Sequence, residues 1–353
     1  MLEILENETL ARYTSWKIGG PARYFLNAAT PDELLEALAW SQERGLSVWL
    51  LGGGTNTLAL DQGFDGVVLR YRGHTLALED QDQEGLLRIG AGAPMAGTAR
   101  RIARQGWAGL EWAEGLPGTI GGALYGNAGC YGSDIATALR RAWLLSAGQI
   151  VEWSVADFGY SYRSSILKKR VGSLGEWGVG SSEWGVASGR VEEWQTRDTR
   201  HETRDTRHET ADGKAEETQT SNLKTTDSPF TIHHSPFTII IEAEFALQRA
   251  DPQELAEIMN RTAAQRRSKT PAGQSCGSVF KNPAGESAGQ LLEAAGLKGR
   301  RVGAAEIAQK HANYIVNTGA ARSGDVLALI DIAREAVLQQ FGIELELEVQ
   351  ILR

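Results

Sequence analysis

The stretch GLEWAEGLPGTIGGALYGNAGCYG, residues 109–132, decides the fold of this chain. It holds eight glycines and one proline in 24 residues. Glycine loses more conformational entropy on folding than any other residue, so this density is costly unless the backbone must approach something closely. The stretch therefore indicates either a backbone pressed against a bulky ligand, such as a flavin with its diphosphate, or a convoluted structural loop.

A second glycine loop, Gly52-Gly53-Gly54-Thr55-Asn56, follows VWLL (48–51), which predicts a buried strand. Exposed N–H groups in such a loop can hold a pyrophosphate, and a hairpin turn is the alternative. A Rossmann dinucleotide site needs a helix directly after the glycines. Here LALDQGFDGVVL (58–69) predicts a turn and a strand instead. Any phosphate binding by this loop is therefore of another kind.

The remaining pattern mixes helices with strands, which predicts an α+β fold. Capping residues and helical periodicity predict helices at 30–44, 95–105, 251–267, 287–295 and 323–340. DQGFDGVVLRY (61–71) predicts a turn followed by a strand, and LLRIGAGA (86–93) predicts a strand that enters a glycine turn. The segment IELELEVQI, residues 343–351, alternates apolar and polar residues throughout. It predicts a strand with one buried face.

Composition narrows the function classes. With 353 residues, 42% of them hydrophobic, the chain is long enough for two or three domains. The net charge of −8 argues against a nucleic-acid partner. Two cysteines, Cys130 and Cys276, form no disulfide scaffold and favour a reducing compartment. The acidic N-terminus has no signal-peptide pattern, and no apolar run is long enough to span a bilayer. A cytoplasmic protein without a membrane partner is expected.

Residues 171–236 differ from the rest of the chain. RDTRHET occurs twice in tandem, and EWGV and SPFTI each occur twice. Ile, Leu, Val and Phe make up only 8 of the 66 residues, too few to bury a core. We expect a disordered insertion in a surface loop. It holds four of the six histidines, which indicate either a metal site or duplicated polar sequence; the absence of zinc-ligand spacing favours the latter, and no metal is expected.

The pairing of LGGGTN with EGLPGTIGGALYGNAGCYG resembles the FAD-binding domain of the UDP-N-acetylenolpyruvoylglucosamine reductases. Five further segments match this family in the same order, so the resemblance covers nearly the whole chain except 171–236. These segments are TSWKIGGPARYF (14–25), YSYRSSILK (160–168), QSCGSVFKNP (274–283), AGQLLEAAGLKG (288–299) and LELEVQI (345–351). The insertion follows residue 168, where one branch of the family carries a tyrosine-bearing substrate loop, so the resemblance is to the branch without it.

The resemblance implies three subdomains. Two form an FAD-binding unit of the PCMH type, residues 1–70 with 341–353 and residues 71–249, and the third is an α+β substrate domain, residues 250–340. The flavin is held largely by backbone groups of the two glycine loops. The implied cofactor-binding residues are Gly52, Gly53, Gly54, Thr55, Asn56, Gly115, Pro117, Gly118, Thr119, Gly122, Asn127 and Gly129. Neither loop contains a histidine, which disfavours covalent attachment of the flavin.

The resemblance also implies a reaction: NADPH reduces FAD, which then reduces UDP-N-acetylglucosamine enolpyruvate to UDP-N-acetylmuramate for peptidoglycan precursors. Ser278 matches the proton donor of the family, and Arg163 and Glu348 match its other catalytic residues. Substrate contacts are implied for Lys281, Asn282 and Gln290. The family commonly has Arg where this chain has Gln350.

Two other functions remain open at this point. One is a different FAD-dependent oxidoreductase or oxidase on the same scaffold. The other is a non-catalytic flavin-binding protein, against which the presence of all three catalytic matches argues. Cys276 lies two residues before Ser278, but no histidine motif accompanies it, so we expect a buried small residue rather than a nucleophile. A monomer is consistent with the sequence, which leaves the oligomeric state open.

Overall fold

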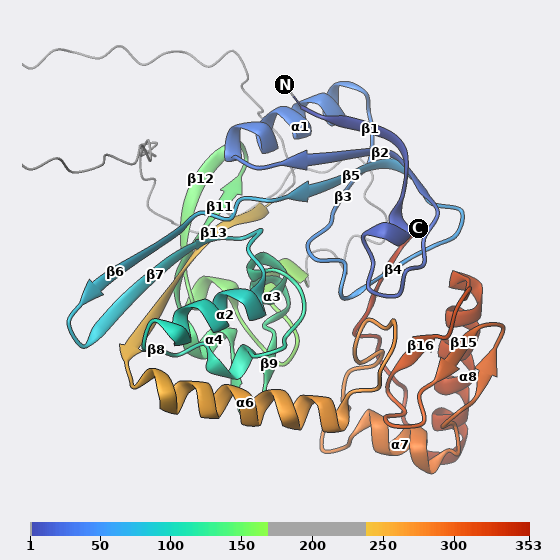
Figure 1. Cartoon of the computed structure of the whole chain (residues 1–353). Helices are drawn as coiled ribbons and strands as arrows, with labels where there is room; N and C mark the ends of the chain where they lie inside the picture. The colour runs from blue at the N-terminus through green and yellow to red at the C-terminus, as the bar shows by residue number, and fades with distance from the viewer. Residues whose placement is uncertain (1, 169–237) are drawn as a thin grey trace, which may run out of the picture.

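The computed structural model describes residues 2–168 and 238–353, so the predicted insertion 171–236 lies outside the described residues. These residues form sheets flanked by helices, which confirms the α+β prediction. Figure 1 shows a blue N-terminal part, a green and cyan central part, and an orange and red part that lies beyond the long helix α6 (Pro252–Lys269). No helix in the described ranges is both long and apolar enough to cross a membrane.

The N-terminal part is a four-stranded sheet in the order β1-β2-β5-β3, covered by one helix. Its elements are β1 Ile4–Thr9, β2 Pro21–Ala28, α1 Pro31–Glu43, β3 Val48–Leu50 and β5 Phe64–Tyr71. The predicted start of α1 is confirmed, because the Thr30 hydroxyl accepts the Glu33 N–H (3.2 Å) and the Glu33 carboxylate accepts the Ala29 N–H (2.7 Å). This reciprocal capping fixes where the chain enters the helix.

The central part is a second sheet in the order β12-β11-β13-β7-β6, with β8 paired to β13. Helices α2, α3 and α4 cover one face of it and enclose the largest apolar core. The other face packs on the N-terminal part, where Trp143 and Ile241 meet Leu34. The strands are β6 Leu76–Gln81, β7 Glu84–Gly90, β8 Trp107–Ala108, β11 Leu139–Ser146, β12 Gln149–Ser154 and β13 Thr238–Arg249. The helices are α2 Met95–Arg104, α3 Ile120–Gly126 and α4 Ile135–Ala138.

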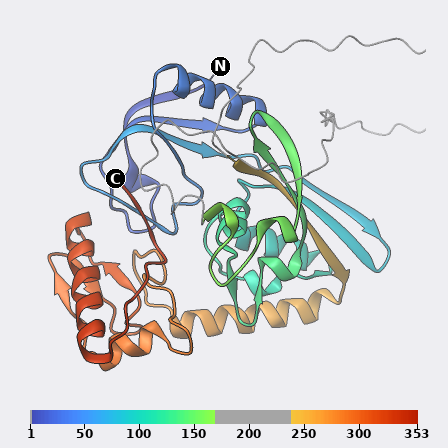
Figure 2. The same cartoon turned by 180° about the vertical axis from the view of Figure 1, so that it is seen from behind.

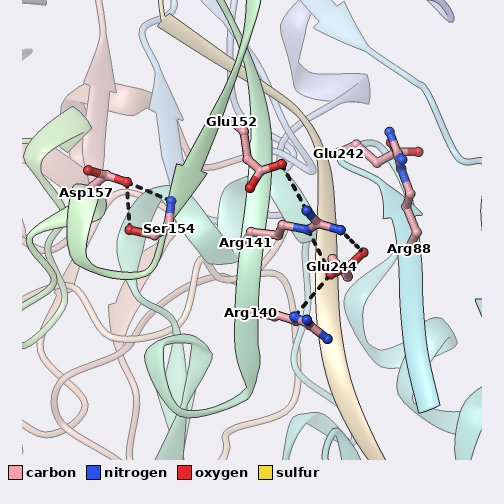
Figure 3. A network of polar contacts seen from close by, with 8 residues as sticks. All are labelled: Arg88, Arg140, Arg141, Glu152, Ser154, Asp157, Glu242 and Glu244. Carbon is pink, nitrogen blue, oxygen red and sulfur yellow. Dashed lines mark hydrogen bonds and ion pairs between the residues drawn. The ribbon is translucent and has the colours of Figure 1, made fainter. Parts of the chain in front are cut away.

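Two buried carboxylates in the middle of β13 are matched by arginines of the neighbouring strands (Figure 3). Arg141 on β11 donates from Nε to Glu244 Oε1 (2.9 Å) and from Nη1 to Glu152 (3.1 Å), and Arg88 on β7 pairs with Glu242. A buried carboxylate without such a partner would be strongly destabilising. The network therefore specifies which strands lie beside β13. None of its members lines the cavity described below.

The C-terminal part is a small three-stranded sheet with two helices, α7 Ala288–Ala294 and α8 Ser323–Phe341. Its strands are β14 Arg301–Val302, β15 Ala305–Ile307 and β16 Ile315–Asn317. Trp16 from the N-terminal part is fully buried in this core, and its indole N–H donates to the carbonyl of Ile315 (2.7 Å). Trp16 thus connects the N-terminal part to the C-terminal part.

The predicted strand 343–351 is only partly correct. Regular strand occurs at β17 Gln350–Leu352, which pairs in parallel with β4 Thr57–Ala59. Before β17, Lys281 N–H donates to the Glu346 carbonyl (2.9 Å) and Glu348 N–H donates to the Val279 carbonyl (2.8 Å). The segment changes partner midway, which interrupts a single ladder. Figure 2 shows it passing from the red C-terminal part to the blue N-terminal part.

Candidate active site

The two glycine loops line one cavity of about 550 Å³ together. The walls come from all three parts of the chain. Residues 52–56 and 115–119 supply the loops, Ser278 comes from the C-terminal part, and Glu348 comes from the returning segment. The fold thus brings together the two stretches that the sequence marked as ligand loops.

Close contacts explain why these positions are glycine. A Cβ on Gly53 would lie 2.8 Å from the Cα of Gly118, so the loops touch each other. Gly54 has a φ of +62°, and a Cβ there would lie 1.8 Å from the carbonyl oxygen of Tyr13. The glycine density therefore serves loop–loop packing at the edge of the cavity as well as the cavity itself.

The cavity suits a long cofactor with a diphosphate. Among the described residues, no acceptor takes the backbone N–H groups of residues 52–55. Consecutive free N–H groups of this kind can hold phosphate oxygens. Beside them the wall is apolar, with Leu51, Leu69 and Ile240, and can cover a planar ring. The strand β4 directly follows the loop, so the expectation that no Rossmann helix follows the glycines is confirmed.

We predict that Gly54→Ala destabilises the chain and lowers its FAD content. Gly45→Ala is the matched control, since Gly45 has the same φ of +62° but no atom within 4 Å of its Cβ. Both variants carry the cost of left-handed alanine, about 1–2 kcal/mol. Only Gly54→Ala adds a clash with backbone, which we expect to cost about 1–3 kcal/mol more. Denaturant unfolding and bound flavin check this; equal losses in the two variants would contradict it.

Arg163 and Glu348 form an ion pair in this cavity. The distance from Arg163 Nε to Glu348 Oε1 is 3.1 Å, and Arg163 Nη1 donates to the carbonyl of Gly129 (2.9 Å). Both side chains are largely buried, with 27% and 17% of their surfaces exposed. Ser278 lines the same cavity. The structure thus gathers the three predicted catalytic residues around one space.

The backbone of Arg163 is held in an unusual conformation, with a φ of +54°. Such a conformation costs about 1–3 kcal/mol for a residue other than glycine and persists only where its surroundings enforce it. Here Ser161 and Ser164 exchange backbone hydrogen bonds (3.0 and 3.1 Å), and Lys168 Nζ donates to the Arg163 carbonyl (3.1 Å). This turn places the guanidinium within ion-pair distance of Glu348.

Positively charged side chains surround the buried carboxylate of Glu348. Burial raises the pKa of Glu348, whereas Arg163, Lys168 and Lys281 lower it. Burial also lowers the pKa of Lys168. Lys281 is paired with Glu346, so Arg163 and Lys168 are the two cations that face the buried Glu348 carboxylate, and this excess of positive charge favours an anionic ligand. The sequence interpretation missed Lys168, although it ends the segment YSYRSSILK that carries Arg163.

Cys276 is not a nucleophile in this setting. Its side chain is buried, and burial raises the pKa of the thiol to about 12. A thiolate, the reactive form, is therefore disfavoured. This agrees with the expected buried small residue.

Some predicted residues lie outside the cavity wall. Asn127 is the C-cap residue of α3 and has a φ of +44°. Its Nδ2 donates to Asp134 Oδ2 (3.1 Å), and its Oδ1 accepts the N–H of Ala136 (3.1 Å). Gly129 lies behind Arg163. The structure therefore gives both residues a supporting place, and neither lines the cavity.

The predicted substrate residues lie at different distances from the cavity. Lys281 pairs with Glu346, and Asn282 donates to the hydroxyl of Tyr162 (3.2 Å), next to Arg163. Gln290 is exposed on α7 and does not line the cavity. None of the three lines the cavity, but Lys281 lowers the pKa of Glu348 and Asn282 contacts the residue before Arg163.

Gln350 and Tyr125 form a pair that sequence reasoning did not anticipate. Gln350 Nε2 donates to the Tyr125 hydroxyl (3.0 Å), and both line the cavity. The period-2 pattern of LELEVQI signalled only that Gln350 shares a face with Glu348.

Comparison with known proteins agrees with this site. Residues 22–152 match an FAD binding domain, and residues 268–352 match the C-terminal domain of UDP-N-acetylenolpyruvoylglucosamine reductase. Proteins named UDP-N-acetylenolpyruvoylglucosamine reductase are 45% identical in Chloroflexus aurantiacus, over 98% of this chain and 96% of theirs, and 34% identical in Rubrobacter xylanophilus, over 98% and 94%.

A solved structure is also similar. The crystal structure of UDP-N-acetylenolpyruvylglucosamine reductase from Thermus caldophilus has a TM-score of 0.69 and 27% identity, covering 100% of this chain and 99% of that one. The likeness of sequence spans both glycine loops, the Ser278 segment and the returning strand. This chain therefore belongs to the UDP-N-acetylenolpyruvoylglucosamine reductase family.

Proposed function

We propose that this chain catalyses the NADPH-dependent, FAD-mediated reduction of UDP-N-acetylglucosamine enolpyruvate to UDP-N-acetylmuramate in peptidoglycan precursor synthesis. The observation that carries the proposal is the Arg163–Glu348 ion pair in the cavity that Ser278 and both glycine loops line. Family membership supports the same reaction, since the relatives are named for it. We place the enzyme in the cytoplasm because its substrates are nucleotides.

The chemistry requires charge stabilisation followed by protonation. Bound FAD supplies the hydride, which it takes from NADPH, to the double bond of the enolpyruvyl ether. Hydride addition places the electron pair of that bond on the α-carbon and its carboxylate. Arg163 offers fixed forked donors to this growing charge. Such electrostatic stabilisation of the transition state is usually the largest single contribution to catalysis. Glu348 orients Arg163 through their contact of 3.1 Å.

Ser278 delivers the proton to the α-carbon in this proposal. A hydroxyl is a poor acid, but the enolic carbanion is a strong enough base to accept its proton. The position of Ser278 is set by a left-handed turn at Gly277 (φ +78°) and by the Val279 N–H, which donates to the Asn313 carbonyl (2.9 Å). The turn and the hydrogen bond fix the backbone on either side of Ser278.

The substrate's own charges fit the site. Its diphosphate and carboxylate are anionic, and Lys168 and Arg163 both line the cavity. We propose that residues 250–340 form the substrate domain, that residues 1–70 with 341–353 and residues 71–249 form the FAD-binding unit, and that Lys281 and Asn282 contact substrate.

A turnover experiment tests the proposed function. The purified chain is supplied with FAD and NADPH, and the absorbance of NADPH is followed with and without the enolpyruvyl substrate. Substrate-dependent NADPH loss, with a product two hydrogens heavier by mass spectrometry, is the expected result. NADPH consumption that ignores the substrate would contradict the proposal.

We predict that Lys168→Met moves the acid limb of the pH–rate profile to higher pH. Lys168 lowers the pKa of Glu348, so removing its charge raises that pKa further above its usual value. The carboxylate that orients Arg163 is then lost at a higher pH. Stopped-flow rates of substrate reduction across a pH series check this, with Lys168→Arg, which keeps the charge, as the control. An unmoved acid limb in Lys168→Met would contradict the assignment.

A further inference from the structure

The side chain of Asn56 reaches from the first glycine loop to the returning C-terminal segment. Its Nδ2 donates to the backbone carbonyl of Glu348 at 2.9 Å. The two residues are 292 positions apart in sequence. A cofactor-binding role was expected for Asn56, yet the hydrogen bond of its side chain goes to a backbone group of the glutamate that pairs with Arg163.

The backbone of Asn56 holds the same segment. Its carbonyl accepts the N–H of Gln350 at 2.9 Å, and the β4–β17 ladder begins at the next residue, with Thr57 opposite Gln350. Asn56 therefore contacts the segment on both sides of Val349. The side chain and the backbone carbonyl of Asn56 together fix the position of the C-terminal segment relative to the first glycine loop.

The backbone N–H and the backbone carbonyl of Glu348 are both hydrogen-bonded, to different segments of the chain. Its N–H donates to the Val279 carbonyl (2.8 Å), one residue after Ser278, and its C=O accepts from Asn56. The Cα of Glu348 thus sits between the Ser278 segment and the first glycine loop. From this point its carboxylate reaches Arg163 Nε at 3.1 Å. A shift of the backbone here would lengthen that contact.

We propose that Asn56 is a positioning residue for Glu348, through which the first glycine loop sets the geometry of the Arg163–Glu348 pair. This inference rests on the proposed function for its kinetic consequence, but its structural consequence does not need the substrate. Because the same loop lines the cofactor cavity, ordering of the loop and placement of the glutamate are coupled.

Asn56→Ala and Asn56→Asp test the proposal kinetically. Aspartate keeps the shape of asparagine but cannot donate to the Glu348 carbonyl. Both variants should slow the substrate half-reaction roughly 10- to 100-fold, and by more than they slow flavin reduction by NADPH, since small misplacements of catalytic groups cost about this much. Glu348→Gln/Asn56→Ala should be no slower than Glu348→Gln alone, because residues that act through one another are non-additive.

Asn317→Ala is the matched control. Asn317 also spans the chain, with Nδ2 donating to the Trp16 carbonyl at 2.9 Å, but it touches no catalytic residue. This variant should lower the unfolding midpoint and leave the substrate half-reaction unchanged. If Asn317→Ala slowed that half-reaction as much as Asn56→Ala does, the effect of Asn56 would be general loosening of the fold, and the proposal would be overturned.

A titration without substrate separates this inference from the proposed function. The FAD-loaded protein is labelled with 13C at glutamate carboxyls, and the Glu348 signal is assigned by its loss in Glu348→Gln. In Asn56→Ala, which adds no charge, the Glu348 pKa should rise, because Arg163 lowers it in the intact pair. An unchanged pKa in Asn56→Ala would overturn the positioning role, whatever the turnover assay shows. Failure of wild-type turnover alone would overturn only the proposed function.

Discussion

Ser278→Ala is expected to leave flavin reduction by NADPH unchanged and to slow flavin reoxidation by the substrate about 10²- to 10⁴-fold, the usual contribution of a general acid. The reason is that the hydroxyl is the proposed proton source and has no part in hydride uptake. Ser278 lies on the cavity wall between the Gly277 turn and Val279, so removing one oxygen leaves the backbone contacts in place. Anaerobic stopped-flow spectroscopy resolves the two half-reactions.

Ser275→Ala is the control for that result, because Ser275 lines the same cavity three residues earlier. It should alter the reoxidation rate by less than about threefold. A Ser278→Ala protein that reoxidises as fast as wild type would remove Ser278 from the chemistry. Equal losses in both serine variants would mean that the wall as a whole, not this hydroxyl, matters.

Arg163→Met is expected to slow reoxidation by substrate about 10²- to 10³-fold, which is the loss seen when one preorganised donor to a developing anion is removed. It also leaves Glu348 buried without its nearest cation. Because Arg163 is the largest of the three influences that lower the pKa of Glu348, that pKa should rise more than in Lys168→Met. The acid limb of the pH profile should therefore shift upward together with the loss of rate.

Arg141→Met supplies the comparison for Arg163→Met. Arg141 is also a partly buried arginine in ion pairs, with Glu244 and Glu152, but it lies in the sheet away from the cavity. It should lower stability without changing the reoxidation rate of the folded protein. If Arg163→Met changed only stability, in the manner expected of Arg141→Met, its catalytic role would be refuted.

Local sequence rules predicted the elements of the fold well. Thr30 with Glu33 marks the start of α1, and in the structure the Thr30 hydroxyl accepts the Glu33 N–H while the Glu33 carboxylate accepts the N–H of Ala29. The helix predicted at 323–340 begins at Ser323 in the structure. The Ser323 hydroxyl donates to Asp61 (2.9 Å), a distant partner that a local helix signal does not reveal.

Long-range partners set the limit of prediction for the site. The resemblance implied that Arg163, Ser278 and Glu348 are catalytic. Sequence spacing does not show that Arg163 Nε and Glu348 Oε1, from segments far apart in sequence, lie 3.1 Å apart. Nor does it reveal the left-handed backbone conformation of Arg163. The alternation in 343–351 predicted one strand, because periodicity does not reveal a change of partner. The resemblance implied cofactor-binding roles for Asn56 and Asn127, but no local pattern shows that their side-chain amides donate to the Glu348 carbonyl and to Asp134.

The most direct test of the account is an anaerobic titration of the purified, FAD-loaded chain, first with NADPH and then with UDP-N-acetylglucosamine enolpyruvate, followed by visible absorbance. The account predicts that the flavin band bleaches with NADPH and returns on addition of the enolpyruvyl substrate, with UDP-N-acetylmuramate as the product. A flavin that bleaches and does not recover with this substrate, or a chain that takes up no FAD, would contradict it.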